Sequence, residues 1–257
     1  MTPRIAAVIP ARMASSRLPG KPLIDIHGLP MIEHVRRRTE MCAGFSSVVV
    51  ATCDQEIADA VQRGGGRVIM TSASHPAATD RVAEAARQID CTHVINVQGD
   101  EILVRPDDLS AMVRSILATP AGEAWNAVAR IESADELADS AIVKCVVSQS
   151  NRVIFAARDL TNLPLKAPGF EPARKILGVL GYSRAFLDRY LSLPRTPIET
   201  LLSVDQSRML EHDIILQGVD FLRGYPGINE TREMLAVLDI IERDPEQRAL
   251  LNATLKA

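Results

Sequence analysis

The sequence has few aromatic residues, few cysteines and no long apolar segment. Phe, Trp and Tyr together make up 4% of the 257 residues, so aliphatic side chains must form most of the core. No apolar stretch reaches the roughly 20 residues that a membrane-spanning helix needs. The N-terminus shows no signal-peptide pattern, because Arg4 is followed by a short apolar run and then by further charged residues. These features favour a globular, cytoplasmic protein.

Charge of one sign is not in excess either. The formal net charge is -3, with 29 Lys and Arg against 32 Asp and Glu. A general nucleic-acid surface needs a clear basic excess, so we expect no nucleic-acid partner. Any positively charged site must therefore be local.

The four cysteines are widely spaced, and no two of them form a Cys-x-x-Cys pair. They are Cys42, Cys53, Cys91 and Cys145. This spacing argues against a zinc knuckle. Their apolar surroundings instead predict reduced thiols within the core of a cytoplasmic protein.

Apolar runs and amphipathic segments alternate along the first half of the chain. We expect buried strands at 5–9, 47–52, 67–70 and 93–97, and helices that start near 29, 54, 79 and 106. Pro10 is expected to end the first strand, and Asp54 to cap the second helix. Repeated β-α-β units of this length predict an α/β fold with a doubly wound, mostly parallel sheet.

The pattern changes after about residue 124. Strands are expected at 127–131, 143–147, 152–155, 175–182 and 214–219, with helices at 185–192 and 198–211 and a last helix from about 229. Because several of these strands follow one another with little helix between them, we expect a smaller β-rich excursion from the sheet. The segment 162–174 is rich in Pro and Gly and is predicted to be a mobile loop.

The most distinctive stretch is the loop of residues 10–22, which follows the first predicted strand. It carries three cations, Arg12, Arg17 and Lys21, among small and turn-forming residues. Such a loop offers backbone N–H groups and positive charge at the carboxyl edge of a sheet, where open α/β sheets bind nucleotides. Guanidinium groups bind phosphate in bidentate fashion, and an ammonium group binds it as a point charge. The pattern predicts a triphosphate site; a solvated basic loop is the alternative.

Asp100 comes directly after the strand predicted at 93–97, at the same edge of the sheet as the cationic loop. Mg²⁺ favours one or two carboxylates together with phosphate oxygens. Alone, this Asp would be read as the cap of the next turn. Beside three cations we interpret it as a metal ligand, because nucleotidyl transfer uses cations and a metal together. Gln98 either contacts a base or simply ends the strand, and Asp80 either contacts the ligand or caps a helix.

Several stretches, in order, resemble the 3-deoxy-manno-octulosonate (KDO) cytidylyltransferase family. They are Ile9-Pro10-Ala11-Arg12, Ser16-Arg17-Leu18-Pro19-Gly20-Lys21-Pro22-Leu23, Pro30-Met31-Ile32-Glu33-His34-Val35, His75-Pro76 with Thr79-Asp80-Arg81, and Asn96-Val97-Gln98-Gly99-Asp100-Glu101. The resemblance is close over about the first 110 residues. It implies a Rossmann-like nucleotide-diphospho-sugar transferase fold and a homodimer. It also implies Mg²⁺ as cofactor, and a reaction of CTP with a small acidic acceptor, such as a KDO-like sugar acid, that gives a CMP conjugate and pyrophosphate.

The resemblance also implies a role for individual residues. Catalytic roles fall to Arg12, Arg17, Lys21 and Asp100, of which the three cations would hold the triphosphate. Nucleotide contacts fall to Pro10, Ala11, Ser15, Ser16, Ala78, Thr79, Asp80, Arg81 and Gln98. Acceptor contacts fall to Arg158, Tyr182, Asp205 and Gln206, and metal contacts to Asp100 and Asn229.

The sequence departs from the family pattern mainly on the acceptor side. Ala78 stands for a glycine, Ile176 for a histidine, Asp205 for a glutamate and Asn229 for the second metal-binding aspartate. An Asn offers a carbonyl oxygen but brings no negative charge to a cation. The nucleotide contacts therefore persist while the acceptor contacts drift. A different acid, such as a phosphonate or an amino-sugar acid, and a catalytically silent nucleotide-binding homologue are the alternatives.

We expect a single nucleotidyltransferase domain in three parts. Residues 1–122 would be the CTP-binding α/β half, and residues 123–228 the part for acceptor binding and dimerisation. Residues 229–257 would be a C-terminal helix that returns to the sheet. The strand-rich stretch 140–182 is the expected dimer arm.

Overall fold

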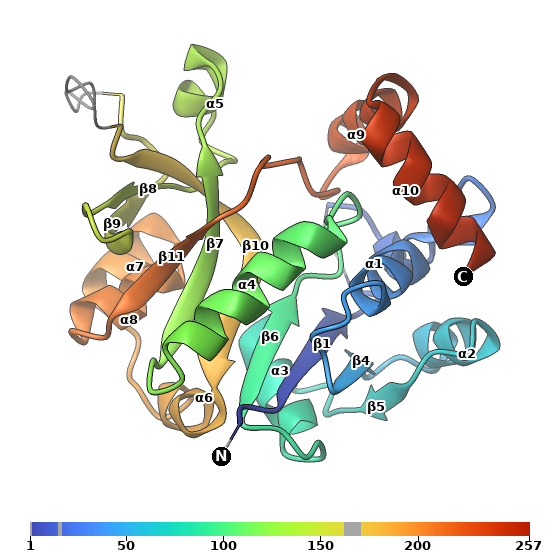
Figure 1. The fold of residues 1–257 in the computed structure, drawn as a ribbon, viewed down its shortest axis with the longest axis horizontal. Helices are drawn as coiled ribbons and strands as arrows, with labels where there is room; N and C mark the ends of the chain where they lie inside the picture. The colour runs from blue at the N-terminus through green and yellow to red at the C-terminus, as the bar shows by residue number, and fades with distance from the viewer. Residues whose placement is uncertain (1, 15–16, 162–170) are drawn as a thin grey trace.

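A nine-stranded sheet with helices on both faces forms the centre of the described chain (Figure 1). The computed structural model describes residues 2–14, 17–161 and 171–257. Its sheet strands are β1 (Ile5–Ala11), β4 (Ser47–Thr52), β5 (Val68–Met70), β6 (His93–Val97), β7 (Ala124–Arg130), β8 (Lys144–Val147), β9 (Arg152–Ala157), β10 (Ala173–Ser183) and β11 (Leu216–Asp220). A separate two-stranded ribbon consists of β2 (Asp25–Ile26) and β3 (Leu29–Pro30).

The helices mostly follow the strands in alternation. They are α1 (Met31–Glu40), α2 (Gln55–Arg63), α3 (Ala78–Ala86), α4 (Pro106–Ala118), α5 (Ala134–Ala138), α6 (Arg184–Tyr190), α7 (Pro197–Leu202), α8 (Gln206–Glu211), α9 (Thr231–Arg243) and α10 (Pro245–Lys256). A 3₁₀ turn, η1 (Lys21–Leu23), lies between β1 and β2. No helix in the described ranges is both long and apolar enough to cross a membrane.

The strand order is β5-β4-β1-β6-β10-β7-β11-β9-β8. Strands β5, β4, β1, β6, β7, β11 and β8 run in one direction, and β10 and β9 run against them. The prediction of a doubly wound, mostly parallel sheet is therefore confirmed. The three strands β4, β1 and β6 are neighbours in this order, so the loops at their carboxyl ends meet at one edge of the sheet.

The β-rich excursion is a closed group of strands. Near its start, β10 pairs with two strands at once, because Arg174 lies opposite Arg130 of β7 and opposite Cys145 of β8. Strands β8, β9, β11 and β7 complete the ring. Further along, β10 changes its second neighbour and pairs with β6, so the ring is joined directly to the parallel part of the sheet.

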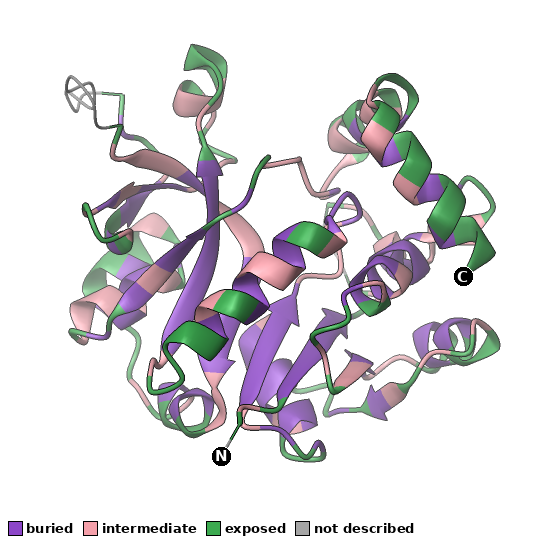
Figure 2. Cartoon of the chain, in the orientation of Figure 1, coloured by how far each residue is buried: buried purple, intermediate pink, exposed green. Residues whose placement is uncertain are grey.

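Both faces of the sheet are buried, as the apolar runs predict. Along β1, Ile5 and Ile9 pack with α1 and α4, whereas Ala6 and Val8 pack with α3 on the other face. Figure 2 shows the central strands almost entirely buried and the outer sides of the helices exposed. With so few aromatic residues, the largest fully buried side chains beside Trp125 and Tyr182 are mostly aliphatic.

Two local predictions in the first half are wrong. Pro10 does not end β1, which continues to Ala11. Strand β6 pairs with β1 only as far as Val8, so one side of Pro10 is unpaired and its missing N–H removes no hydrogen bond from that side. Asp54 occupies the position before α2 but makes no side-chain cap; its carboxylate instead accepts the Met13 N–H at 2.7 Å.

The helices of the second half are shorter than predicted. The helix expected at 198–211 is two helices, α7 and α8, because Ser203 has φ 53 and breaks the helical path. The last helix is likewise two, because Asp244 is extended and Pro245 begins α10. The short helix α5 was not expected. The four thiols are free, with Cys53 half-buried and the other three buried.

An ion pair joins α7 to α8. Glu199 is 0% exposed and accepts a hydrogen bond from Arg208 Nε at 2.8 Å. Burial by itself would raise the pKa of Glu199, but hydrogen bonds from Arg208, the Thr196 N–H and Arg195 outweigh it and lower that pKa to about 2. Because the folded pKa lies below the ordinary 4.5, the stabilisation is complete above pH 4.5 and is lost as pH falls toward 2.

Glu199→Gln is expected to lower the free energy of unfolding by about 3 kcal/mol at pH 7, because Arg208 loses its partner in a largely buried place. Urea denaturation at pH 7 and at pH 3 measures this, and the gap between variant and wild type should narrow at pH 3. Arg195→Gln is the control: Arg195 is 64% exposed, and its loss should cost less than about 1 kcal/mol. If wild type and Glu199→Gln differed in unfolding free energy by the same amount at both pH values, the lowered pKa assigned to Glu199 would be wrong.

Candidate active site

The loops after β1 and β6 touch each other at the edge of the sheet. A side chain at Gly99 would place its Cβ 2.8 Å from the Pro10 carbonyl oxygen. Only glycine allows so close an approach of two backbones. The loop after β4 joins them, since the Asp54 carboxylate holds the Met13 N–H.

Lys21 is the centre of this meeting point. Gly20, with φ 71, turns the chain into η1, which begins with Lys21. The Lys21 Nζ donates to Asp100 Oδ2 at 2.9 Å and to Asn229 Oδ1 at 3.3 Å. The Lys21 and Asp100 side chains are 17% and 21% exposed. The structure therefore brings together residues from three distant parts of the sequence, and the expectation that Lys21 and Asp100 face one cleft is confirmed.

A first cavity of about 290 Å³ opens beside Lys21. Arg12 and Arg17 line it with exposed side chains. Neither guanidinium has a hydrogen-bond or ion-pair partner among the described residues, so both are available to an anion. Other predicted residues on its wall are Pro10, Ala11, Ala78, Arg81, Gln98, Asp100 and Asn229. Ser15 and Ser16 lie outside the described residues.

The far wall of the first cavity is built by the segment before α3 and by α3 itself. Arg81 is buried, and its guanidinium donates to Thr71 Oγ1 and to Cys53 Sγ. Arg81 is thus held by the ends of β4 and β5. His75 also lines this cavity and is paired with Glu84. His75 lies in one of the stretches that resemble the family, His75-Pro76, but no role was predicted for it.

A second cavity of about 540 Å³ adjoins the first. The two share Gln98, Asp100 and Asn229 on their walls. Of the residues expected at the acceptor, the second cavity is lined by Tyr182, Asp205 and Gln206; it is also lined by Thr79 and Ile176. Asp80 and Arg158 line neither cavity. The Arg158 guanidinium donates to backbone carbonyl oxygens instead.

The polar side chains of the second cavity differ in how they are held. Gln206 Nε2 donates to Asn126 Oδ1 at 2.9 Å, whereas the Asp205 carboxylate has no hydrogen bond within the described part of the chain. Burial, and then the charge of Glu199, raise the pKa of Asp205. Burial also raises the pKa of Tyr182 well above its usual range.

Sequence reasoning missed Glu101, which also lines the second cavity. Its Oε1 accepts the Gly178 N–H at 2.8 Å. Burial first, and then the neighbouring charge of Asp100, raise the pKa of Glu101 to about 7. Its position directly after Asp100 was the signal that could have drawn attention to it.

The described chain holds no group of three or more His, Cys, Asp or Glu side chains able to bind a metal. Two oxygens, Asp100 Oδ2 and Asn229 Oδ1, converge on the Lys21 ammonium, and both are of the kind that binds divalent cations. A divalent cation there would need its remaining ligands from water or from a bound molecule.

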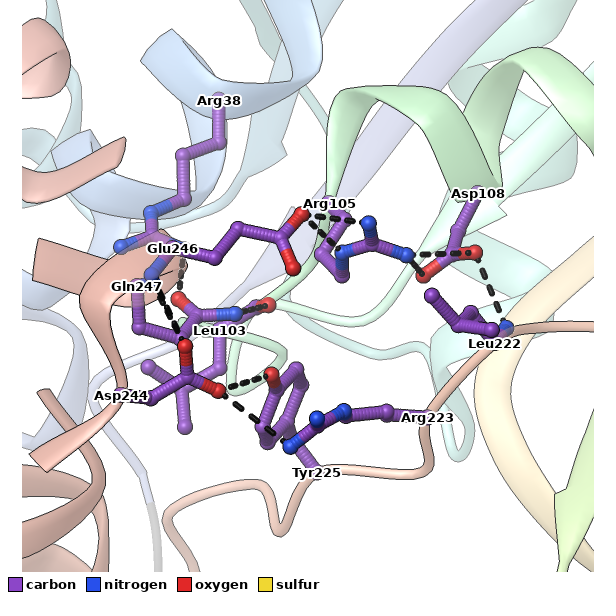
Figure 3. Close-up of polar contacts among 10 residues, drawn as sticks. All are labelled: Arg38, Leu103, Arg105, Asp108, Leu222, Arg223, Tyr225, Asp244, Glu246 and Gln247. Carbon is purple, nitrogen blue, oxygen red and sulfur yellow. Dashed lines mark hydrogen bonds and ion pairs between the residues drawn. The ribbon is translucent and has the colours of Figure 1, made fainter. Parts of the chain in front are cut away.

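Residues 221–229, here called the Asn229 strap, carry Asn229 to the site. The strap joins β11 to α9 and is held at several points. Its Leu222 N–H donates to Asp108 Oδ1 at 3.1 Å, and its Ile228 N–H donates to the Asp100 carbonyl oxygen at 3.2 Å. Between them the Tyr225 hydroxyl donates to Asp244 Oδ2 at 2.7 Å (Figure 3).

The start of α10 is the anchor for Tyr225. Asp244 caps α10 by accepting the backbone N–H of Glu246 at 2.9 Å. In the first turn of α10, Gln247 Nε2 donates to the Leu103 carbonyl oxygen at 3.0 Å, and Gln247 Oε1 accepts from Arg38 Nη1 at 2.6 Å (Figure 3). The strap is therefore tied through α10 to α1 and to the segment before α4.

Comparison with known proteins gives a consistent result. The model of the family described as cytidylyltransferase matches residues 6–220. The 3-deoxy-manno-octulosonate cytidylyltransferase of Rhodopseudomonas palustris is 42% identical over 227 residues, which cover 83% of this chain and 91% of that protein. The enzyme of the same name from Geobacter metallireducens is 34% identical over 250 residues, which cover 93% and 98%.

A solved structure is also closely similar. The structure titled CMP:2-keto-3-deoxy-manno-octonic acid synthetase complexed with CTP superposes with a TM-score of 0.88 and 34% identity. The superposition covers 94% of this chain and 99% of that chain. A cytidylyltransferase from Leptospira borgpetersenii, at 16% identity and a TM-score of 0.65, shares the fold.

Tyr225→Phe is expected to loosen the Asn229 strap without unfolding the protein. Loss of the hydrogen bond from the Tyr225 hydroxyl to the charged Asp244 carboxylate should lower the free energy of unfolding by about 1–3 kcal/mol. Hydrogen exchange should become faster at the amides of Leu222 and Ile228. Tyr190→Phe is the control, since its hydroxyl contacts Asp205 O at 3.4 Å, away from the strap. Unchanged exchange in the strap would show that Asp244 does not anchor it.

Proposed function

Because the chain belongs to the cytidylyltransferase family, we propose that it couples CTP to a small KDO-like sugar acid, giving a CMP-sugar acid and pyrophosphate. One observation carries the proposal: Asp100, which lines both cavities, accepts a hydrogen bond at 2.9 Å from the Nζ of Lys21, which lines the first cavity. A reaction between two bound molecules needs such a junction of two cavities. The KDO cytidylyltransferases that this chain resembles, and the related structure titled as a complex with CTP, support the choice of substrates.

CTP would occupy the first cavity. Its triphosphate would lie against Arg12, Arg17 and Lys21, of which the two guanidinium groups have no other partner in the described chain. Its cytidine would extend toward Ala78 and Gln98. Thr79 and Asp80, which do not line this cavity, could act on the nucleotide only through α3.

The acceptor would occupy the second cavity, near Tyr182, Asp205 and Gln206. Its hydroxyl oxygen attacks the α-phosphorus of CTP. The new P–O bond forms as the bond to the bridging oxygen breaks, pyrophosphate leaves with the electron pair, and the hydroxyl proton passes to solvent. Such phosphoryl chemistry is mostly positioning and charge neutralisation, which Arg12 and Lys21 supply at the departing pyrophosphate.

We propose Mg²⁺ as the cofactor. The residues fit it, because Asp100 and Asn229 already direct two oxygens at one positive charge, and phosphate oxygens would complete the ligand set. When bound, Mg²⁺ neutralises phosphate charge and acts as a Lewis acid. Asn229 keeps an oxygen ligand in place but contributes no negative charge.

The acceptor, the assembly and the location complete the proposal. A panel of KDO, amino-KDO, sialic-type acids and small phosphonates would identify the acceptor. We propose a homodimer formed through the 140–182 region, where β9 exposes Ile154 (57%) and Phe155 (39%). Since CTP is drawn from the nucleotide pool of the cell, we propose that the enzyme acts in the cytoplasm.

Lys21→Ala is expected to fold normally and to lose at least about a hundredfold in pyrophosphate release with Mg-CTP and KDO, because one preorganised cation is gone. Lys256→Ala, at the exposed end of α10, is the matched control and should keep full turnover. Activity of Lys21→Ala equal to wild type would refute the assignment. If CTP bound by calorimetry but none of the acceptors in the panel gave pyrophosphate, the result would favour a silent nucleotide-binding protein.

Asn229→Asp is expected to lower the Mg²⁺ concentration for half-maximal activity by at least about tenfold, because a second carboxylate joins Asp100. Asn229→Ala should raise it. A Mg²⁺ titration of pyrophosphate release at fixed CTP measures both. Identical Mg²⁺ dependence in wild type and both variants would place the cation elsewhere.

A further inference from the structure

The guanidinium of Arg158, the residue after β9, donates hydrogen bonds to backbone carbonyl oxygens of two separate segments. Its Nε donates to the Leu202 carbonyl oxygen at 3.2 Å, and its Nη2 to the Ser203 carbonyl oxygen at 3.1 Å. Its Nη1 donates to the carbonyl oxygens of Ser140 at 3.0 Å and Ala141 at 3.4 Å. The planar guanidinium thus bridges the segment before β8 and the turn between α7 and α8.

Both bridged segments belong to the wall of the second cavity. Ala141 and Ser203 line that cavity, whereas Arg158 does not. An Arg that bound an acceptor directly would have to release several carbonyl oxygens first. Its present contacts instead hold two parts of the wall at a fixed separation.

The turn that Arg158 holds is unusual in its backbone. Ser203 has φ 53, a left-handed conformation that costs energy for a residue other than glycine. Arg158 binds the carbonyl groups of Ser203 and of the residue before it. Directly after this turn come Asp205 and Gln206, which line the second cavity. The conformation of the turn therefore decides where these two side chains stand.

We infer that Arg158 is a positioning residue of the acceptor cavity: it clamps the turn at Ser203 to the segment at Ala141 and so places Asp205 and Gln206 for the acceptor. This inference rests on the proposed function, since it assigns the second cavity to the acceptor. Lysine cannot replace the clamp, because an ammonium group has no planar fork to span two segments.

The first test separates positioning from direct contact. Arg158→Lys and Arg158→Gln, in the full chain, should both raise KM for KDO at least about tenfold and leave KM for CTP within about twofold of wild type. The rise in KM should be equally large with KDO whose C1 carboxylate is replaced by an amide, because a side chain and a carboxylate that are not in contact have additive effects. If Arg158→Lys keeps the wild-type KM, or if the rise in KM disappears with the amide, Arg158 contacts the carboxylate directly and the inference is overturned.

The second test needs no acceptor. Hydrogen exchange of the free protein should be faster in both variants at the amides of 140–143 and 202–206, and unchanged in β1. Arg152→Gln is the matched control, because Arg152 is the first residue of β9, the strand that Arg158 follows, and its side chain makes no polar contact in the described chain. Unchanged exchange in both segments would overturn the clamp. If the wild type gave no pyrophosphate with CTP and KDO, the proposed function would fail while this measurement still decided the role of Arg158.

Discussion

The contact of Lys21 with Asp100 is the interaction on which the rest of this molecule depends. It joins the loop after β1 to the loop after β6, and its Asp100 lines both cavities. Two backbone conditions make it possible. Gly20 turns Lys21 inward, and Gly99 lets the second loop approach Pro10 more closely than any side chain would allow. An ion pair so little exposed is oriented in advance for an anionic ligand.

The other half of the site is held from a distance. Asn229 stands beside Lys21 because its strap is tied to Asp108, to Asp100 and, through Tyr225, to the start of α10. The second cavity follows the same principle, because Arg158 and the Glu199–Arg208 pair hold the turn before Asp205. Side chains that face the cavities are thus placed by neighbours that do not face them, which is how a site keeps its geometry.

This division explains how much the sequence alone could predict. The strands at 47–52 and 93–97, the parallel sheet and the meeting of Lys21 with Asp100 follow from local apolar runs and from where parallel strands end. Local patterns could not indicate that Asp54 binds Met13 rather than capping α2, or that Tyr225 binds Asp244. Those contacts join residues that only the tertiary structure brings together. The left-handed Ser203 was equally hidden, because serine carries no signal for that conformation.

Asn229 acquires a physical meaning from its surroundings. Lys21 contacts one carboxylate, Asp100, and one neutral amide, Asn229, so the positive charge of Lys21 is matched by a single negative charge before any ligand binds. Glu101 lies next to Asp100, and burial together with that neighbouring charge already raises its pKa to about 7. A carboxylate at position 229 would add a further negative charge to this half-buried group and make ionisation of Glu101 still less favourable. The neutral amide avoids that repulsion. The Mg²⁺ proposed here would consequently be held by only one carboxylate, Asp100, and would take more of its ligands from the phosphates of the nucleotide.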